Sequence, residues 1–162
     1  MRIQLKKGRD GAPNLTCIRA DGTRTFGKVH PFFPLHDLTH YAVESVLGFD
    51  RAFFGLVASG WSLDDFADKA TRARMPAEAL WAENVVGLLD LERGTGRMMT
   101  AEELSTGLRD SLARQGVAPF RAITEDELVR VRTLRGRLSA QWTAVPPGET
   151  LEVSFPATAS VP

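Results

Sequence analysis

The chain has 162 residues, 43% of them hydrophobic and 25% charged, and its 20 basic and 20 acidic side chains give zero net charge. This composition predicts one globular domain, residues 1–155, with a frayed tail at residues 156–162. Balanced charge and the lack of an apolar run of roughly 18 residues argue against nucleic-acid and membrane partners. A single cysteine rules out an internal disulfide, so we expect a cytoplasmic protein.

Three short runs near the N-terminus alternate apolar and polar side chains, at residues 3–6, 14–19 and 23–29. Asp21-Gly22 separates the second run from the third and is a hairpin signal, because glycine accepts the positive φ of a primed turn. These runs predict a three-stranded antiparallel meander. Cys17 lies on an apolar face of the second run, where we expect a buried structural thiol.

Helical signals dominate the rest of the chain. The expected helices are residues 35–47, 51–59, 62–74, 77–92, 100–115 and 124–142. Thr100 and Thr124 each stand three positions before a glutamate, which is the pattern of a capping box. Residues 149–155 alternate again and predict a last strand that pairs with the meander. We therefore predict an α+β fold, in which the meander and the C-terminal strand form a small antiparallel sheet packed against five or six helices.

The only strong indication of chemistry lies at the start of the expected helix 35–47. His36, His40 and Glu44 are spaced four apart, which places them on one helical ridge, and Asp37 borders it. The apolar stripe of the helix runs beside the ridge, so we expect its histidine end to be partly desolvated. Two histidines one turn apart can bind one metal ion, so we predict a site for zinc or another divalent metal, with Glu44 as third ligand.

Other residues compete for the position of the third ligand, because the rotation between His36 and Glu44 strains the geometry. A carboxylate from another helix or strand can complete the coordination shell of the metal, and His30, near the end of the preceding strand, is a further candidate ligand. Three acids follow His40 by 24–28 residues, at Asp64, Asp65 and Asp68. Acids at the start of a helix also favour its dipole, which explains them without a metal.

The run His36-Asp37-x-x-His40 resembles the His-Glu-x-x-His helix of zinc-dependent peptidases. That resemblance implies His36 and His40 as zinc ligands and Asp37 as the base that activates water, or as a further ligand. Asp37 stands where the peptidases have glutamate. The same residues resemble the His-Asp-x-x-His motif of ubiquinone-biosynthesis accessory proteins, whose proposed metal site adds a glutamate after eleven intervening residues. Ala52 occupies that position here.

These patterns lead to three hypotheses. The first is a metal-binding protein acting as a metal-dependent hydrolase on an unknown small-molecule substrate, with metal-bound water as the nucleophile. The second is a non-enzymatic interaction module or homodimer, which buries the apolar helices around Phe53 and Phe54 and has structural histidines. The third is a protein that binds a small apolar ligand in a helical pocket lined by phenylalanine and tryptophan.

Overall fold

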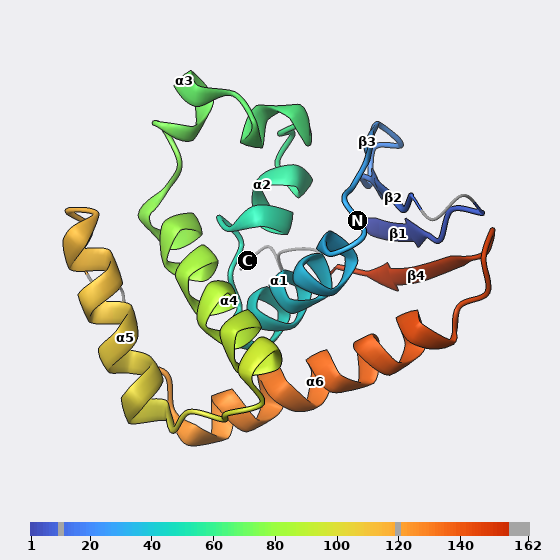
Figure 1. Ribbon diagram of the computed structural model, residues 1–162. Helices are drawn as coiled ribbons and strands as arrows, with labels where there is room; N and C mark the ends of the chain where they lie inside the picture. The colour runs from blue at the N-terminus through green and yellow to red at the C-terminus, as the bar shows by residue number, and fades with distance from the viewer. Residues whose placement is uncertain (10–11, 119–120, 156–162) are drawn as a thin grey trace, which may run out of the picture.

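The computed structural model describes residues 1–9, 12–118 and 121–155, so the tail expected at 156–162 lies outside the described residues. Four strands form one antiparallel sheet in the order β3-β2-β1-β4 (Figure 1). The C-terminal strand pairs with β1, which confirms the predicted α+β fold. The strands are β1 (Arg2–Lys6), β2 (Asn14–Ile18), β3 (Arg24–Lys28) and β4 (Thr150–Ser154).

One face of the sheet is apolar because alternate residues of a strand point to the same side. Ile3 lies opposite Cys17, and Leu5 opposite Leu15, across the β1–β2 pair. All four side chains are at most 1% exposed. Burial raises the pKa of the Cys17 thiol to about 12, so it stays protonated and belongs to the core, as expected.

Residues of α1, α2 and α6 pack against the apolar face of the sheet, while α4 and α5 lie farther from the strands (Figure 1). Helix α1 is central, because it packs against α2, α4 and α6. None of the helices in the described ranges combines the length and the apolar composition needed to cross a membrane. The helices are α1 (Phe33–Leu47), α2 (Phe53–Ala58), η1 (a 3-10 turn, Asp64–Phe66), α3 (Lys69–Arg72), α4 (Ala77–Thr95), α5 (Ala101–Arg114) and α6 (Glu125–Ala144).

The prediction of one helix over residues 62–74 is wrong, because η1 and α3 are separate. Asp68 lies between them with an extended backbone, at ψ 125°, and its carboxylate accepts a hydrogen bond of 2.7 Å from the Thr71 amide. A short acidic side chain bonds more readily to a free amide at a helix start than it supports a helix interior. Asp68 therefore caps α3 and ends the turn before it.

Both predicted capping boxes are present and fix the starts of α5 and α6. The Thr100 hydroxyl oxygen accepts a hydrogen bond from the Glu103 amide, and the Glu103 carboxylate accepts one from the Thr100 amide. Thr124 and Glu127 do the same at α6. Helix α4 runs three residues beyond its expected end, to a left-handed Gly96 at φ 71°.

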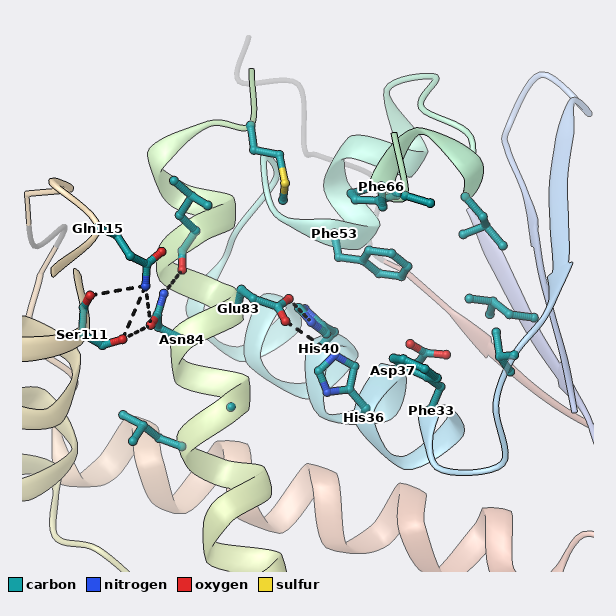
Figure 2. A pocket seen from close by; sticks show the side chains of 18 of the residues that line it. Phe33, His36, Asp37, His40, Phe53, Phe66, Glu83, Asn84, Ser111 and Gln115 are labelled. Carbon is teal, nitrogen blue, oxygen red and sulfur yellow. Dashed lines mark hydrogen bonds and ion pairs between the residues drawn. The ribbon is translucent and has the colours of Figure 1, made fainter. Parts of the chain in front are cut away.

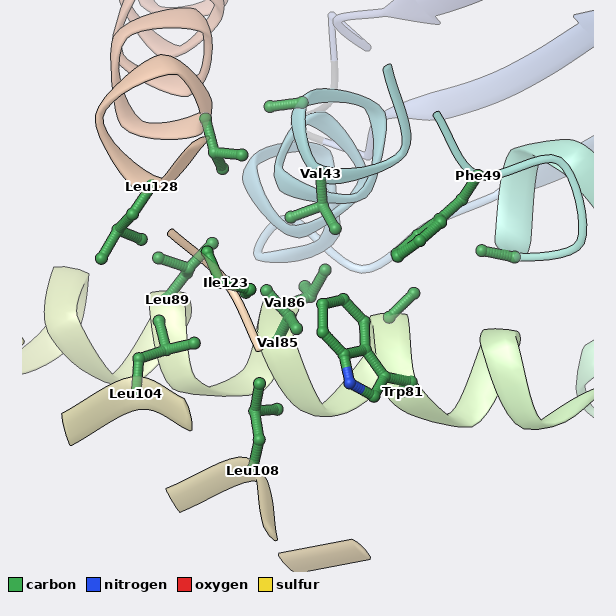
Figure 3. Close-up of a cluster of buried hydrophobic side chains, with 14 of the residues drawn as sticks. Val43, Phe49, Trp81, Val85, Val86, Leu89, Leu104, Leu108, Ile123 and Leu128 are labelled. Atoms are coloured by element: carbon green, nitrogen blue, oxygen red, sulfur yellow. The ribbon is translucent and has the colours of Figure 1, made fainter. Parts of the chain in front are cut away.

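Two clusters of buried side chains hold the fold together. The helix cluster lies between α1, α4, α5 and α6, and Figure 3 shows Val43 of α1 directed at Trp81 and Val85 of α4. The sheet cluster lies between the strands and helices α1, α2 and α6, and includes Leu38 and Phe54. Helix α1 contributes to both clusters, so its orientation is fixed on two sides and its histidine ridge faces the space that remains.

Candidate metal centre

A cleft of about 1280 Å³ opens between the sheet, α1 and α4 and reaches as far as α5 (Figure 2). His36, Asp37 and His40 line it from α1, and Glu83 and Asn84 line it from α4. Ligand sites in proteins are usually concave, mostly apolar, and carry a few converging polar groups. The cleft has these features where α1 and α4 meet.

Two imidazoles and one carboxylate converge at this point. The rings of His36 and His40 lie one turn apart, with centroids separated by 4.8 Å. Glu83 faces both rings: its Oε2 is 3.0 Å from His40 Nε2 and its Oε1 is 3.9 Å from His36 Nε2. One nitrogen or oxygen from each residue lies within 4.8 Å of the others. We call these three residues the His/His/Glu cluster.

Each imidazole also meets a second carboxylate on its other nitrogen. His36 Nδ1 is hydrogen-bonded to Asp90 Oδ2 at 2.8 Å, and Arg93 Nη2 lies 3.1 Å from the other Asp90 oxygen. His40 Nδ1 lies 3.4 Å from Glu44 Oε1. An ionised carboxylate can only accept a hydrogen bond, so both Nδ1 atoms carry hydrogen. The Nε2 atoms also face a carboxylate, that of Glu83, so a cation that displaced hydrogen from Nε2 would leave each Nδ1 still turned to its own carboxylate.

Glu44 is itself held in place by the main chain of α2. Its oxygens accept hydrogen bonds from the Phe54 amide at 3.2 Å and the Gly55 amide at 3.1 Å, and the residue is 1% exposed. The first amides of a helix lack partners within the helix, so a carboxylate satisfies them well. Glu44 thus joins the start of α2 to the back of the His40 ring.

The protonation of the cluster follows from its charges. Burial lowers the pKa of His40, but hydrogen bonds to Glu44 and Glu83 outweigh burial and raise it to about 10. Without a metal, His40 is therefore an imidazolium paired with two carboxylates. For Asp37, burial is the largest effect and raises the pKa to about 7, while attraction to His40 and His36 opposes the rise.

The structure brings His36 and His40 together and adds Glu83, which sequence reasoning missed. Glu44 contacts His40 from the side opposite to Glu83 and does not face His36. Asp37 lines the cleft but is not a member of the cluster, so its role in activating water stays a prediction. Glu83 lies 43 residues after His40 on another helix, and no spacing rule connects the two.

The remaining candidates serve other purposes or lie elsewhere. His30 is exposed, and its ring packs edge-on against Phe33. Asp65 accepts hydrogen bonds from the Ser62 amide and hydroxyl. Asp64 lines the cleft, but it is exposed and stands outside the His/His/Glu cluster.

The fold and the site define an α+β protein with two histidines and a carboxylate converging in a cleft. Comparisons with protein-family models, with curated proteins and with solved structures found no significant match. A proposal of function rests therefore on the geometry of the cluster and of its cleft.

Proposed function

We propose that His36, His40 and Glu83 bind a divalent metal ion, with zinc as the expected ion, and that the protein is a metal-dependent hydrolase. One observation carries the proposal: each imidazole turns Nδ1 to a carboxylate and Nε2 to Glu83. Histidines that bind metals almost always donate their second N–H to a carboxylate, a carbonyl or water. A histidine that only packs at the border of a hydrophobic core does not require a carboxylate at each of its ring nitrogens.

The ligand set and its spacing suit a catalytic ion. Two histidines and one carboxylate are a common set for catalytic zinc, which keeps a fourth position for water. In a tetrahedral shell with bonds of about 2.1 Å, the ligand atoms lie about 3.4 Å apart. The three atoms here lie within 4.8 Å of one another, and the Glu83 side chain is 55% exposed toward the cleft.

The position in a cleft supports hydrolysis. A divalent ion lowers the pKa of a bound water toward neutrality, which supplies a nucleophile. His36 and His40 hold the ion at the wall of the cleft, and Glu83 comes from the facing helix. A substrate in the cleft would lie beside the open position of the ion.

Metal binding is tested on protein purified without an affinity tag, by elemental analysis and by calorimetric titration of the EDTA-treated protein with ZnCl2. We expect one equivalent of zinc in the native chain, no measurable binding in His40→Ala, and an affinity at least about tenfold lower in Glu83→Gln. His30→Ala is the matched control and should bind like the native chain. Absence of stoichiometric binding, or equal binding by Glu83→Gln, would overturn the proposal.

The carboxylate behind His36 gives a finer test of the same site. Asp90→Asn removes the charge that orients the ring but none of the proposed ligands, so zinc affinity should fall about 10- to 100-fold at unchanged stoichiometry. Asp110→Asn makes the same change at an exposed residue that lines the cleft from α5 and should have no effect. Equal zinc affinity of these two variants would show that Asp90 does not support metal binding by His36.

Hydrolysis is tested separately with the zinc-loaded protein and a panel of activated esters, amides and phosphate esters. We expect turnover that is lost in His40→Ala and retained in His30→Ala. Stoichiometric zinc without turnover would overturn the hydrolase part and favour the interaction module. Light scattering of the same sample would then show whether two chains associate.

A further inference from the structure

Asp37 presents a buried carboxylate to the cleft beside the His/His/Glu cluster. The residue is 5% exposed and lines the cleft, and its Oδ2 has no hydrogen-bond partner among the described residues. Burying a carboxylate is costly unless a donor or a cation compensates for the lost water. An unsatisfied buried group in a cleft is explained when its partner arrives with a ligand.

The cleft around Asp37 is aromatic and apolar. Figure 2 shows Phe53 and Phe66 on the same side of the cleft as Asp37, away from the polar side chains of α5. The rings of Phe53 and Phe66 are in contact, with centroids 4.6 Å apart and planes inclined at 50°. Aromatic faces bind apolar groups and attract cations, above all where water is excluded. Such a wall favours a ligand with an apolar body.

The charges nearby favour a cationic group on that ligand. Acids predominate around the two imidazoles, which leaves an excess of negative charge when all are ionised. The charged groups are the carboxylates of Asp37, Glu44, Glu83 and Asp90, the guanidinium of Arg93 and the imidazolium of His40. Both histidines attract Asp37, but their ring nitrogens are already engaged by the other three carboxylates. Asp37 is therefore left to pair with a charge from outside the chain.

We propose that the cleft binds a small organic amine, with an aromatic or aliphatic body against Phe53 and Phe66 and a protonated amino group paired with Asp37. Amine binding needs only the cleft and Asp37. The further step, that an amine-bearing ester or amide is the substrate of the metal centre, rests on the proposed function. Its hydrolysis would break the acyl C–O or C–N bond by adding one water, with the hydroxyl going to the acyl carbon and one proton to the leaving oxygen or nitrogen. The proton of the new carboxylic acid is released to solvent when an ester is cleaved and is taken up by the product amine when an amide is cleaved.

The probe is 2-phenylethylamine, titrated calorimetrically into EDTA-treated protein at about pH 8, where the amine is protonated and carboxylates are ionised. The neutral isostere 2-phenylethanol and the anion 3-phenylpropionate are titrated in parallel. We expect the amine to bind at least about tenfold more tightly than the alcohol, and the anion not to bind. Equal binding of amine and alcohol by the native chain would overturn the proposal without any variant.

Asp37→Asn should abolish the preference for the amine and leave the weaker binding of the alcohol unchanged. Asp64→Asn removes an exposed acid from the same cleft and should keep the preference. Folding of both variants is checked by circular dichroism, and Asp37→Asn should melt no lower than the native chain, since it removes a buried unpaired charge. A preference that survives in Asp37→Asn would refute the pairing.

The two proposals fail separately. His40→Ala should lose zinc and still prefer the amine, because the amine does not need the metal. A native chain that binds the amine but no zinc would overturn the proposed function and leave this inference standing. A chain that binds zinc but does not distinguish amine from alcohol would overturn this inference and leave the proposed zinc site standing.

Discussion

At the scale of single residues, the position of a carboxylate around an imidazole decides what it does. Glu44 comes from the same helix as His40, is buried, and meets Nδ1. Glu83 comes from the facing helix, is half-exposed, and meets Nε2. The buried carboxylate orients the ring, and the half-exposed one is the metal ligand in the function that we propose. Helical spacing predicts the contact between His40 and Glu44, but the side of the ring that Glu44 reaches depends on the rotation of both side chains.

Another residue-scale contact gives the stability a defined pH dependence. A hydrogen bond from Arg121 Nη1 at 2.9 Å, followed by one from the Thr124 amide at 3.0 Å, lowers the pKa of Glu127 to about 2. The folded pKa is below the ordinary value of 4.5, so the ionised form stabilises the fold. This stabilisation is complete above about pH 5 and disappears as the pH falls toward about 2.

Glu127→Gln keeps a hydrogen-bonding side chain in the capping box but removes the charge. We expect it to lower the free energy of unfolding by about 0.5–1 kcal/mol at neutral pH and by progressively less below about pH 4.5. Urea unfolding at several pH values measures the difference. The control variant is Glu102→Gln, which makes the same change at an exposed residue in the first turn of α5. A difference for Glu127→Gln that is constant across pH would contradict the assignment.

At the scale of elements, the short helix α2 is fixed by one close approach of backbone to backbone. A Cβ on Gly55 would lie 2.2 Å from the carbonyl carbon and oxygen of Asp50, far inside any permitted contact. The same residue donates its amide to Glu44. Only glycine lets α2 lie close enough to the preceding turn to hold the carboxylate behind His40.

Gly55→Ala should therefore lower the free energy of unfolding by about 2 kcal/mol or more, because backbone must move to relieve the overlap. Gly136→Ala is the matched control in α6, where a Cβ would meet nothing within 4 Å. It should raise stability by about 0.5–1 kcal/mol, since alanine has the better helix propensity. Urea unfolding of both variants provides the comparison. Changes of the same sign would show that the contact at Asp50 does not constrain α2.

At the scale of the whole molecule, α1 and α6 connect the two hydrophobic clusters. Val43 lies in the helix cluster and Leu38, five residues earlier on α1, in the sheet cluster. Leu128 and Leu138 divide α6 in the same way. A helix that is shared by two clusters is destabilised when either one opens. The single domain expected for residues 1–155 is therefore predicted to unfold as one unit.

Tryptophan fluorescence tests this cooperativity, because Trp81 belongs to the helix cluster and Trp142 to the sheet cluster. Trp61 is replaced by phenylalanine in both proteins, so that Trp81→Phe leaves Trp142 to report on the sheet side and Trp142→Phe leaves Trp81 to report on the helix side. In each variant the fluorescence transition in urea should coincide with the transition in far-ultraviolet circular dichroism. Transitions separated by more than the experimental error would indicate two independently unfolding parts.

The sequence by itself determined the features that depend on a few neighbouring residues. Alternation predicts the strands, Thr100 and Thr124 mark the starts of α5 and α6, and spacing of four puts His36 and His40 on one ridge. These patterns could be found because a strand or a helix repeats its geometry every two to four residues.

Only the tertiary structure decided which groups complete the site. Glu83 and Asp90 meet the histidines because α4 packs against α1, and the residues in contact are 43 and 54 positions apart in the chain. No local periodicity encodes such a pair, since it depends on how side chains of both helices fit together. The break at Asp68 was missed for a related reason: a carboxylate that caps its own backbone competes with helix propensity, and the geometry of the chain decides the outcome.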